Sequence, residues 1–333
     1  MSGEVWRQQL EAGLETTWGT ATSGTRKLYP LLDGFSVTNE REGRPKRMAV
    51  NSRANVRGFT SGPDLVGGTA RIDLSPDELV EWLLITLEGG VTPTTPSGGT
   101  LARLWEFVPG GEDLDSATFR YDDGANVWIA AGVYGQSLTV EGSADAENTV
   151  TCELFGKSRV AGALTGGLAD RTPTFLEGWQ ARAYIDAFEG TPGTTLVAGL
   201  LDWTITLNNN LTRKYYADND RAANKIPIGT LEATAQISFE ASEAVATAEL
   251  ANWDADTPRL VRLQFLGPAN GIETGQTASV AFDLPGHWSA PALANEGEGT
   301  REYQLTLETR YDPTNLFMAR VLVTNARATA WGA

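Results

Sequence analysis

A pair of alternating segments separated by a long polar stretch constrains the fold of this chain most strongly. Apolar and polar residues alternate from Leu201 to Leu207, and the alternation resumes from Thr230 to Glu240. A period of two is typical of β-strands that bury one face. The connection is much longer than the roughly two to five residues of a tight hairpin turn. We therefore expect a long arm over residues 208–228, either a mobile surface loop or a segment that contacts another subunit.

The same order of features occurs earlier in the chain. Leu32–Thr38 is similar in character to Leu201–Leu207, and Thr69–Leu74 (TARIDL) is similar to Thr234–Phe239 (TAQISF). The first pair also encloses a polar segment, over residues 38–57. This order predicts a second hairpin with its own long arm.

A helix is expected after each hairpin. Ser75–Glu78 (SPDE) combines an N-cap serine, a proline at the first helical position and a glutamate placed for a capping box. Ser242 is expected to cap a weaker second helix. A third match joins Leu138–Glu141 (LTVE) to Leu305–Glu308 (LTLE).

These matches favour two copies of one unit over two unrelated β-rich domains. We expect an extended N-terminal arm over residues 1–30 that lies outside the core, a first domain over 31–165 and a second over 166–333. The predicted fold class is mainly β: two tandem β-sandwich or half-barrel units, each with one flanking α-helix and a long hairpin arm. The best linker candidate is residues 156–174. The remaining expected strands are Leu101–Val108, Thr118–Tyr121, Trp128–Val133, Gln136–Glu141, Thr149–Phe155, Gln180–Phe188, Leu260–Leu266, Thr277–Leu284, Tyr303–Thr309 and Met318–Asn325.

Composition excludes several classes of protein. Hydrophobic residues make up 41% of the 333 residues, which indicates a folded chain with enough apolar surface for a core in each domain. A net charge of −16 argues against a protein that binds nucleic acid by a positive field. The single cysteine excludes an intrachain disulfide and favours a reducing cytosol. The N-terminus has no signal-peptide pattern, and no apolar run is long enough to span a membrane.

The sequence offers little for catalysis. The lone histidine, His287, is expected in a surface turn, and Cys152 in a buried strand, so a Cys/His metal site is excluded. Asp122–Asp123 suits a glycosidase pair but is more typical of a turn. Asp218–Asp220 begins like a calcium loop but lacks its glycine and final glutamate. We therefore expect no enzyme activity, no cofactor and no metal.

Charge is segregated between the arms and the rest of the chain. Residues 40–57 hold six basic and two acidic side chains, and residues 211–225 hold four and two. Basic arms on an acidic chain indicate either self-association or simple loop solubility, and we favour self-association. Trp18 is expected to be buried against a neighbouring chain. The basic residues expected at intersubunit contacts are Arg41, Arg44, Lys46, Arg47, Arg53, Arg57, Arg213, Lys214, Arg221 and Lys225.

Two stretches carry a family resemblance. Leu201–Asn210 (LDWTITLNNN), followed by an arm and Ile228–Ala235 (IGTLEATA), resembles the major tail tube proteins of long-tailed, siphovirus-type bacteriophages. Glu15–Thr20 (ETTWGT) is similar to the N-terminal arm of that family. The resemblance covers most of the chain as an order of elements, in a form with a duplicated domain.

The resemblance implies a structural virion protein that assembles with itself. Sheets of neighbouring subunits would complete an inner β-barrel, and three duplicated chains would form a pseudo-hexameric ring. Stacked rings would form the tube through which dsDNA passes into the host, with the arms bridging the rings. An acidic lumen would repel DNA phosphates, so that DNA slides without specific binding.

The implied partners and locations follow from the same resemblance. They are the tape-measure protein and the tail terminator and tip proteins, in the virion tail, after assembly in the host cytoplasm. No membrane is implied. The alternatives are a Trp-rich β-sandwich that binds carbohydrate, another β-rich virion or baseplate protein, and a glycoside hydrolase that uses an acidic pair.

Overall fold

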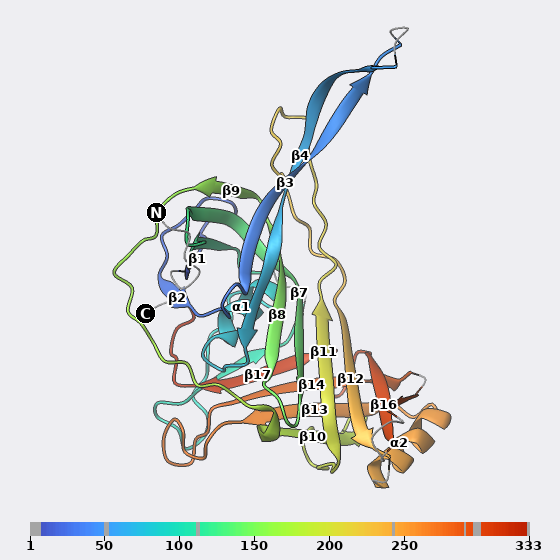
Figure 1. Ribbon diagram of the computed structural model, residues 1–333. Coiled ribbons are helices and arrows are strands. Elements are labelled where there is room, and N and C mark those ends of the chain that lie inside the picture. Colours follow the sequence, from blue (N-terminus) through green and yellow to red (C-terminus); the bar gives the residue numbers. More distant parts are fainter. Residues whose placement is uncertain are drawn as a thin grey trace.

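The chain is mainly β, and its computed structural model describes residues 8–49, 53–110, 114–241, 244–289, 291–295 and 301–331 (Figure 1). The helical elements are α1 (Leu79–Thr86), the 3-10 helix η2 (Gly178–Gln180) and α2 (Ala244–Asp254). The strands are β1 (Gln9–Leu14), β2 (Arg26–Leu28), β3 (Phe35–Arg47), β4 (Val56–Asp73), β5 (Arg103–Phe107), β6 (Ala117–Asp122), β7 (Val127–Ser143), β8 (Thr149–Gly156), β9 (Ser158–Ala161), β10 (Ala181–Ala187), β11 (Leu200–Asn208), β12 (Glu232–Glu240), β13 (Arg259–Leu266), β14 (Ser279–Trp288), β15 (Ala292–Asn295), β16 (Glu302–Thr309) and β17 (Arg320–Asn325).

One antiparallel sheet runs through both halves of the chain, and we call it the long sheet. Its strand order is β3, β4, β8, β7, β11, β12, β16 and β15. The first four strands come from the first half of the chain and the last four from the second. The pairing of β7 with β11 therefore joins the two halves (Figure 1).

Each half adds further strands beyond the long sheet. In the first half, the order is β2, β1, β6, the beginning of β7 and β9. In the second half, the order is β10, β13, β14, β17 and β5, so one strand of the first half completes this group. Figure 1 shows β13, β14 and β17 crossing below the long sheet at a steep angle to its strands.

The strand pairings of the first half recur in the second half. Six pairings of the first half each have a counterpart in the second half. The pair β1–β6 corresponds to β10–β13, β6–β7 to β13–β14, and β7–β8 to β14–β16. The pair β4–β8 corresponds to β12–β16, β7–β9 to β14–β17, and β3–β4 to β11–β12. In this pattern β16 occupies the place of β8. The expected match of Leu138–Glu141 with Leu305–Glu308 is therefore wrong, because the strand that corresponds to β16 contains Val150–Glu153.

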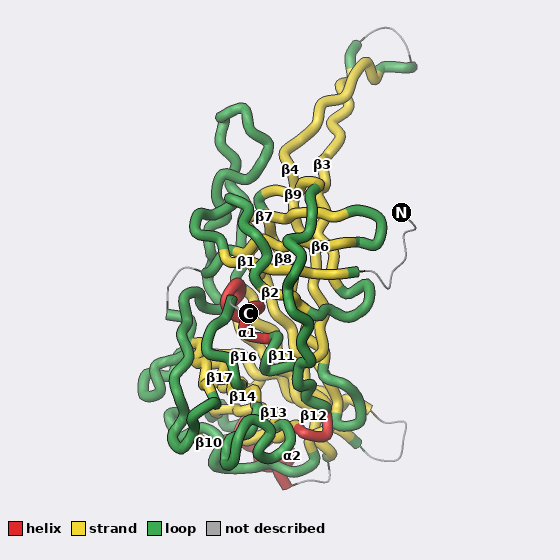
Figure 2. Tube along the Cα trace, turned by 90° about the vertical axis from the view of Figure 1, so that its left-hand side faces the viewer, coloured by secondary structure: helices red, strands yellow, loops and turns green. Residues whose placement is uncertain are grey.

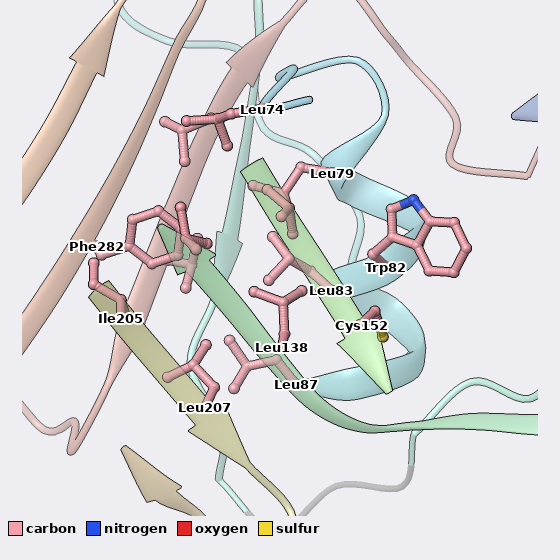
Figure 3. Close-up of a cluster of buried hydrophobic side chains, with 14 of the residues drawn as sticks. Leu74, Leu79, Trp82, Leu83, Leu87, Leu138, Cys152, Ile205, Leu207 and Phe282 are labelled. Atoms are coloured by element: carbon pink, nitrogen blue, oxygen red, sulfur yellow. The ribbon is translucent and has the colours of Figure 1, made fainter. Parts of the chain in front are cut away.

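Helix α1 lies inside the molecule and is buried along its whole length. Leu79 and Leu83 point toward Ile205 and Phe282 of the second half, while Trp82 faces the other way (Figure 3). Residues of both halves thus form one hydrophobic cluster rather than two separate cores. This shared burial of apolar side chains stabilises the contact between the halves.

The start of α1 differs in part from the predicted capping box. Ser75 accepts a hydrogen bond at its hydroxyl from the amide of Asp77 at 3.2 Å, as an N-terminal cap would. Glu78 does not reach back to Ser75. Its buried carboxylate accepts hydrogen bonds from the amide of Tyr29 at 3.1 Å and from Arg171 at 2.7 Å instead. Ser242, the expected cap of α2, lies outside the described residues.

The described part of the N-terminal segment is not an arm outside the core. Strand β1 pairs with β6, and Leu10, Ala12 and Leu28 are buried. The two strands expected over 128–133 and 136–141 are one bent strand, β7, because Gly132 adopts a positive φ of 66° and the register with β8 shifts between Gly135 and Ser137. The expected linker holds β9, followed by residues 162–176 without regular structure.

Candidate functional site: the polar face and the two arms

Polar side chains cover one face of the long sheet, and we call this surface the polar face. Residues alternate along each strand, so the opposite face holds core residues such as Ile205 and Ile237. The polar face comprises Ser36, Thr38, Thr69, Arg71, Asp73, Ser137, Thr139, Glu141, Thr149, Thr151, Glu153, Asp202, Thr204, Thr206, Glu232, Thr234, Gln236, Ser238, Glu240, Glu302, Gln304, Thr306 and Glu308.

Strand register aligns these side chains in rows across both halves. One row runs from Arg71 through Thr151, Thr139, Thr206 and Thr234 to Glu308, with each residue directly opposite the next. The hydroxyl oxygens of Thr139 and Thr206 lie 3.4 Å apart where the halves meet. The polar face is therefore continuous across the junction of β7 with β11.

The polar face is strongly acidic. Among the described residues assigned to it, Arg71 is the single cation. The carboxylates are Asp73, Glu141, Glu153, Asp202, Glu232, Glu240, Glu302 and Glu308. Glu240 lies directly opposite Glu302, an arrangement of like charges that disfavours folding. A surface of this charge repels phosphate groups and is screened by salt.

Asp73 lies at the end of the polar face away from the arms. Burial raises the pKa of its carboxyl group, and the nearby carboxylates of Glu147 and Glu177 raise it further. Arg71 opposes this shift only weakly, as the last of the four causes. The acidic character of the surface therefore continues past the strand end into the turn after β7.

The first arm, residues 38–65, is a continuation of β3 and β4 beyond the end of β8. The two strands remain paired as far as Arg47 and Val56, and the hairpin projects well away from the rest of the chain (Figures 1 and 2). The segment expected as a loop is thus largely regular hairpin. Phe59 is 73% exposed on it, which is unusual for a large apolar side chain.

The basic residues of the first arm differ in their contacts. Arg41 pairs across the hairpin with Asp64, and Arg44 pairs with Glu42 at 2.9 Å. The other four are exposed and have no carboxylate within ion-pair distance in the described part of the chain: Lys46, Arg47, Arg53 and Arg57.

The second arm, residues 209–231, contains no regular strand, but its two sides meet at a bridge between Lys214 and Lys225. It runs beside the first arm at the same end of the long sheet (Figures 1 and 2). Asp64 donates its amide hydrogen to the carbonyl of Arg221 at 2.9 Å, and the Tyr215 hydroxyl donates to the carbonyl of Asp64 at 2.8 Å. The two arms are therefore joined within one chain.

Arg213 anchors the second arm rather than projecting from it. Its guanidinium donates to the carbonyl of Val66 at 2.5 Å and lies 3.7 Å from the centre of the Phe155 ring. Burial lowers the pKa of this guanidinium. Lys225 and Lys214 take part in the bridge through their backbones, and Arg221 accepts its bond from Asp64 through its carbonyl, so these contacts do not use the three exposed side chains.

Trp18 has its contacts within its own chain. Its ring stacks with Tyr134 at 6.4 Å between centroids, and its indole N–H donates to the carbonyl of Gly132 at 3.2 Å. The ammonium of Lys157 lies 4.7 Å from the ring centre. Contact of Trp18 with a neighbouring subunit would have to leave these contacts within its own chain in place.

The residues considered above for catalysis make contacts that are typical of residues with a structural role. Asp123 accepts hydrogen bonds from the amides of Ala125 and Asn126, as a turn residue does. His287 lies in strand β14, not in the expected turn, and pairs with Asp256 at 3.2 Å. Burial raises the pKa of Cys152 to about 12. The described residues contain no group of three or more potential metal ligands.

The described tryptophans do not form a platform for sugars. Trp82, Trp105, Trp203 and Trp288 are buried in the core. Trp179 is 74% exposed, but no ring contact within the described residues joins it to another aromatic side chain. Aromatic stacking surfaces for ligands need several exposed rings together.

Comparison with known proteins agrees with a surface built for assembly. A search of curated proteins gives no match. A family model described as phage tail tube protein matches residues 6–310, which is nearly the whole chain and includes both arms and the complete polar face. On this match, the chain belongs to the phage tail tube protein family.

Proposed function

We propose that this protein is the tail tube subunit of a long-tailed, siphovirus-type phage, and that its polar face lines the channel through which dsDNA leaves the virion. The observation that carries the proposal is the continuity of the acidic face across both halves of the chain. A surface of eight carboxylates and one arginine is destabilised by repulsion between like charges, but this charge suits the passage of an anionic ligand that must not adhere. DNA phosphates are such a ligand, because cationic contacts would hold them by counterion release.

We further propose that the chain is an internal duplicate, with tube domains over residues 31–165 and 166–333. The six strand pairings that recur in the same arrangement support this division. Three chains would then supply six similar units to a ring, which is a closed cyclic assembly. Closure also covers strand edges that an isolated chain leaves open.

The arms are proposed to bridge stacked rings. Both leave the long sheet at the same end, and the first carries four exposed cations without described carboxylate partners. These cations are opposite in charge to the acidic remainder of the chain, so contact with the next ring would bring positive and negative side chains together. Arg41, Arg44, Lys46, Arg47, Arg53 and Arg57 would act at the ring contact, followed by Lys214, Arg221 and Lys225. Arg213 would support it by fixing the second arm.

Other parts of the proposal follow from the family. The tube would assemble in the host cytoplasm around the tape-measure protein and would contact terminator and tip proteins at its two ends. The protein would act in the virion as a structural component, without catalysis and without a cofactor.

Electron microscopy of the purified protein tests the proposal. After concentration or heating to promote assembly, negative stain should reveal rings and hollow tubes, and light scattering should give ring masses in multiples of three chains of 35.7 kDa. A protein that remains a monomer in every condition, or that forms solid fibres without a channel, would contradict it.

A further inference from the structure

Strands of the two halves pair in two places, β7 with β11 and β17 with β5, and two open strand edges resemble the two sides of the β7–β11 junction. We call the junction the internal seam: Ser137–Ser143 of β7 pairs with Asp202–Asn208 of β11. At one end of the long sheet, β3 pairs only with β4 among the described strands. At the other end, β16 is followed by the end of β14 and by β15, whose outer sides have no described partner strand.

The repeated strand pairings place β3 in the position of β11. Thr69–Ile72 (TARI) of β4 matches Thr234–Ile237 (TAQI) of β12, which fixes the alignment of the two halves. Ser36 lies opposite Thr69, and Thr206 lies opposite Thr234. Ser36 therefore corresponds to Thr206.

The same alignment places the end of β14 in the position of the second part of β7. It aligns Thr151 of β8 with Thr306 of β16. Thr139 lies opposite Thr151, and Ser289 donates its amide hydrogen to the carbonyl of Thr306 at 2.7 Å. Ser289 therefore corresponds to Thr139, which lies opposite Thr206 across the internal seam.

The backbone of β3 is oriented for pairing on its open side. Arg71 donates its amide hydrogen to the carbonyl of Gly34 at 2.7 Å, so Gly34 and Ser36 face β4. Since backbone groups alternate along an antiparallel strand, those of Val37 face outward. The Val37 carbonyl accepts a hydrogen bond from the Tyr121 hydroxyl, and Val37 is only 1% exposed, so pairing with a second strand requires the Tyr121 side chain to move aside.

The end of β14 is oriented in the same way. The amide of Ser289 faces β16, so the backbone of Trp288 faces outward. In the internal seam, Asn209 donates to the carbonyl of Gln136 at 2.9 Å, which makes Thr139 and Thr206 a pair without mutual backbone bonds. The two open edges thus have the alternation that the seam requires.

We propose that the end of β14 in one chain pairs with β3 of a second copy in the register of the internal seam, with Ser289 opposite Ser36 of that copy. The two serine hydroxyls would then repeat the contact of Thr139 with Thr206, whose oxygens lie 3.4 Å apart. Each ring would contain the same junction within chains and between chains. This inference rests on the proposed ring and names the strands and the register that close it.

Disulfide trapping tests the register. Directly opposite residues of a pair without mutual backbone bonds have Cα atoms about 4.5 Å apart, within the range of a disulfide. The variant Ser36→Cys/Ser289→Cys should give covalent dimers and trimers, and none larger, on non-reducing gels after mild oxidation. The native Cys152 is buried, so it gives little background.

Two control variants make the result specific. Thr139→Cys/Thr206→Cys carries the same geometry inside one chain and should form an intrachain disulfide at similar yield. Thr38→Cys/Ser289→Cys displaces the register by two residues and should cross-link at least tenfold less. Rings that form without the Ser36–Ser289 link, or that link better through Thr38, would overturn the seam while leaving the proposed tube intact. Chains that never form rings would contradict the proposed function itself.

Discussion

The guanidinium of Arg213 lies 3.7 Å from the centre of the Phe155 ring, so an arm of the second half is fastened to a strand of the first half. The same group donates to the carbonyl of Val66 at 2.5 Å. A charged hydrogen bond and a cation–π contact thus act together where the two arms leave the long sheet.

Replacement of this arginine should loosen the second arm. Arg213→Ala is expected to lower the free energy of unfolding by about 1–3 kcal/mol, from the lost hydrogen bond and ring contact. Urea titration measures this change. Arg213→Lys keeps the charge but loses the planar stacking, so its free energy of unfolding should lie between those of the wild type and Arg213→Ala. An Arg213→Ala variant as stable as the wild type, with unchanged protease sensitivity in residues 209–231, would show that the arm is held elsewhere.

Neutralising the polar face should increase DNA adhesion. Glu141→Gln/Glu308→Gln removes two exposed carboxylates from the face without changing side-chain size. Assembled tubes of this variant should retain roughly threefold or more short dsDNA than wild-type tubes at low salt, because the repulsion of phosphates is reduced. Co-sedimentation of tubes with labelled DNA measures the retention.

A matched variant controls for net charge. Glu189→Gln/Asp254→Asn removes the same two charges at exposed positions, in the turn after β10 and at the end of α2, neither of which belongs to the polar face. Its tubes should retain as little DNA as the wild type. Equal retention by both variants would mean that overall charge, and not the polar face, controls DNA adhesion.

The polar face could be predicted from the sequence only in part. Alternation predicted most strands correctly, including β11, β12 and β16, because each buries one face of a two-residue period. The acidic lumen that the family resemblance implies stays a prediction. The sequence could not assign Glu141 and Glu308 to one surface, because that depends on which distant strands pair and in what register.

Other features depended on context that no local pattern carries. Strands β1 and β2 were missed because their segments are short and polar, and they are held by pairing with β6 and with each other. The anchoring of Arg213 was missed for a similar reason. A basic residue in a polar arm has the same sequence signature whether it faces solvent or a distant aromatic ring.

The contact of Glu273 with the first half should make stability depend on pH. Its carboxylate accepts hydrogen bonds from the Thr100 hydroxyl and from the amides of Thr100, Leu101 and Ala102. These bonds, the hydroxyl first, lower the pKa of Glu273 from 4.5 to about 2. A lowered pKa in the folded state stabilises the protein above pH 4.5, and this contribution is lost as the pH falls toward 2.

Glu273→Gln should therefore lower the melting temperature at pH 7, and the difference from wild type should shrink as the pH falls from 4.5 toward 2. Differential scanning calorimetry across this range measures the effect. Glu189→Gln, at an exposed position in another loop of the second half, should show no such convergence. A difference that stays constant with pH would mean that Glu273 acts by packing alone.

Charge reversal on the first arm should separate ring formation from ring stacking. Lys46→Glu/Arg47→Glu/Arg53→Glu/Arg57→Glu changes the four exposed cations without described carboxylate partners and leaves Ser36 and Ser289, which are proposed to meet at ring closure, unchanged. Rings should form, but tubes should shorten at least tenfold, because the arm would meet an acidic surface with the wrong sign. Tube lengths from negative-stain images measure this result.

The control for this variant preserves charge at the same positions. Lys46→Arg/Arg47→Lys/Arg53→Lys/Arg57→Lys should polymerise nearly as the wild type does. High salt should weaken wild-type stacking, because exposed ion pairs are screened. Normal tubes from the reversed variant would remove the first arm from the ring contact.

A cryo-electron-microscopy reconstruction of the assembled protein would show whether the polar face lines a closed channel. We predict stacked rings of three chains around an open channel, with Glu141, Glu153, Glu232 and Glu308 facing the channel and the first arm crossing to the next ring. A reconstruction in which these carboxylates lie on the outer wall, or in which the chain does not form a closed ring, would contradict it.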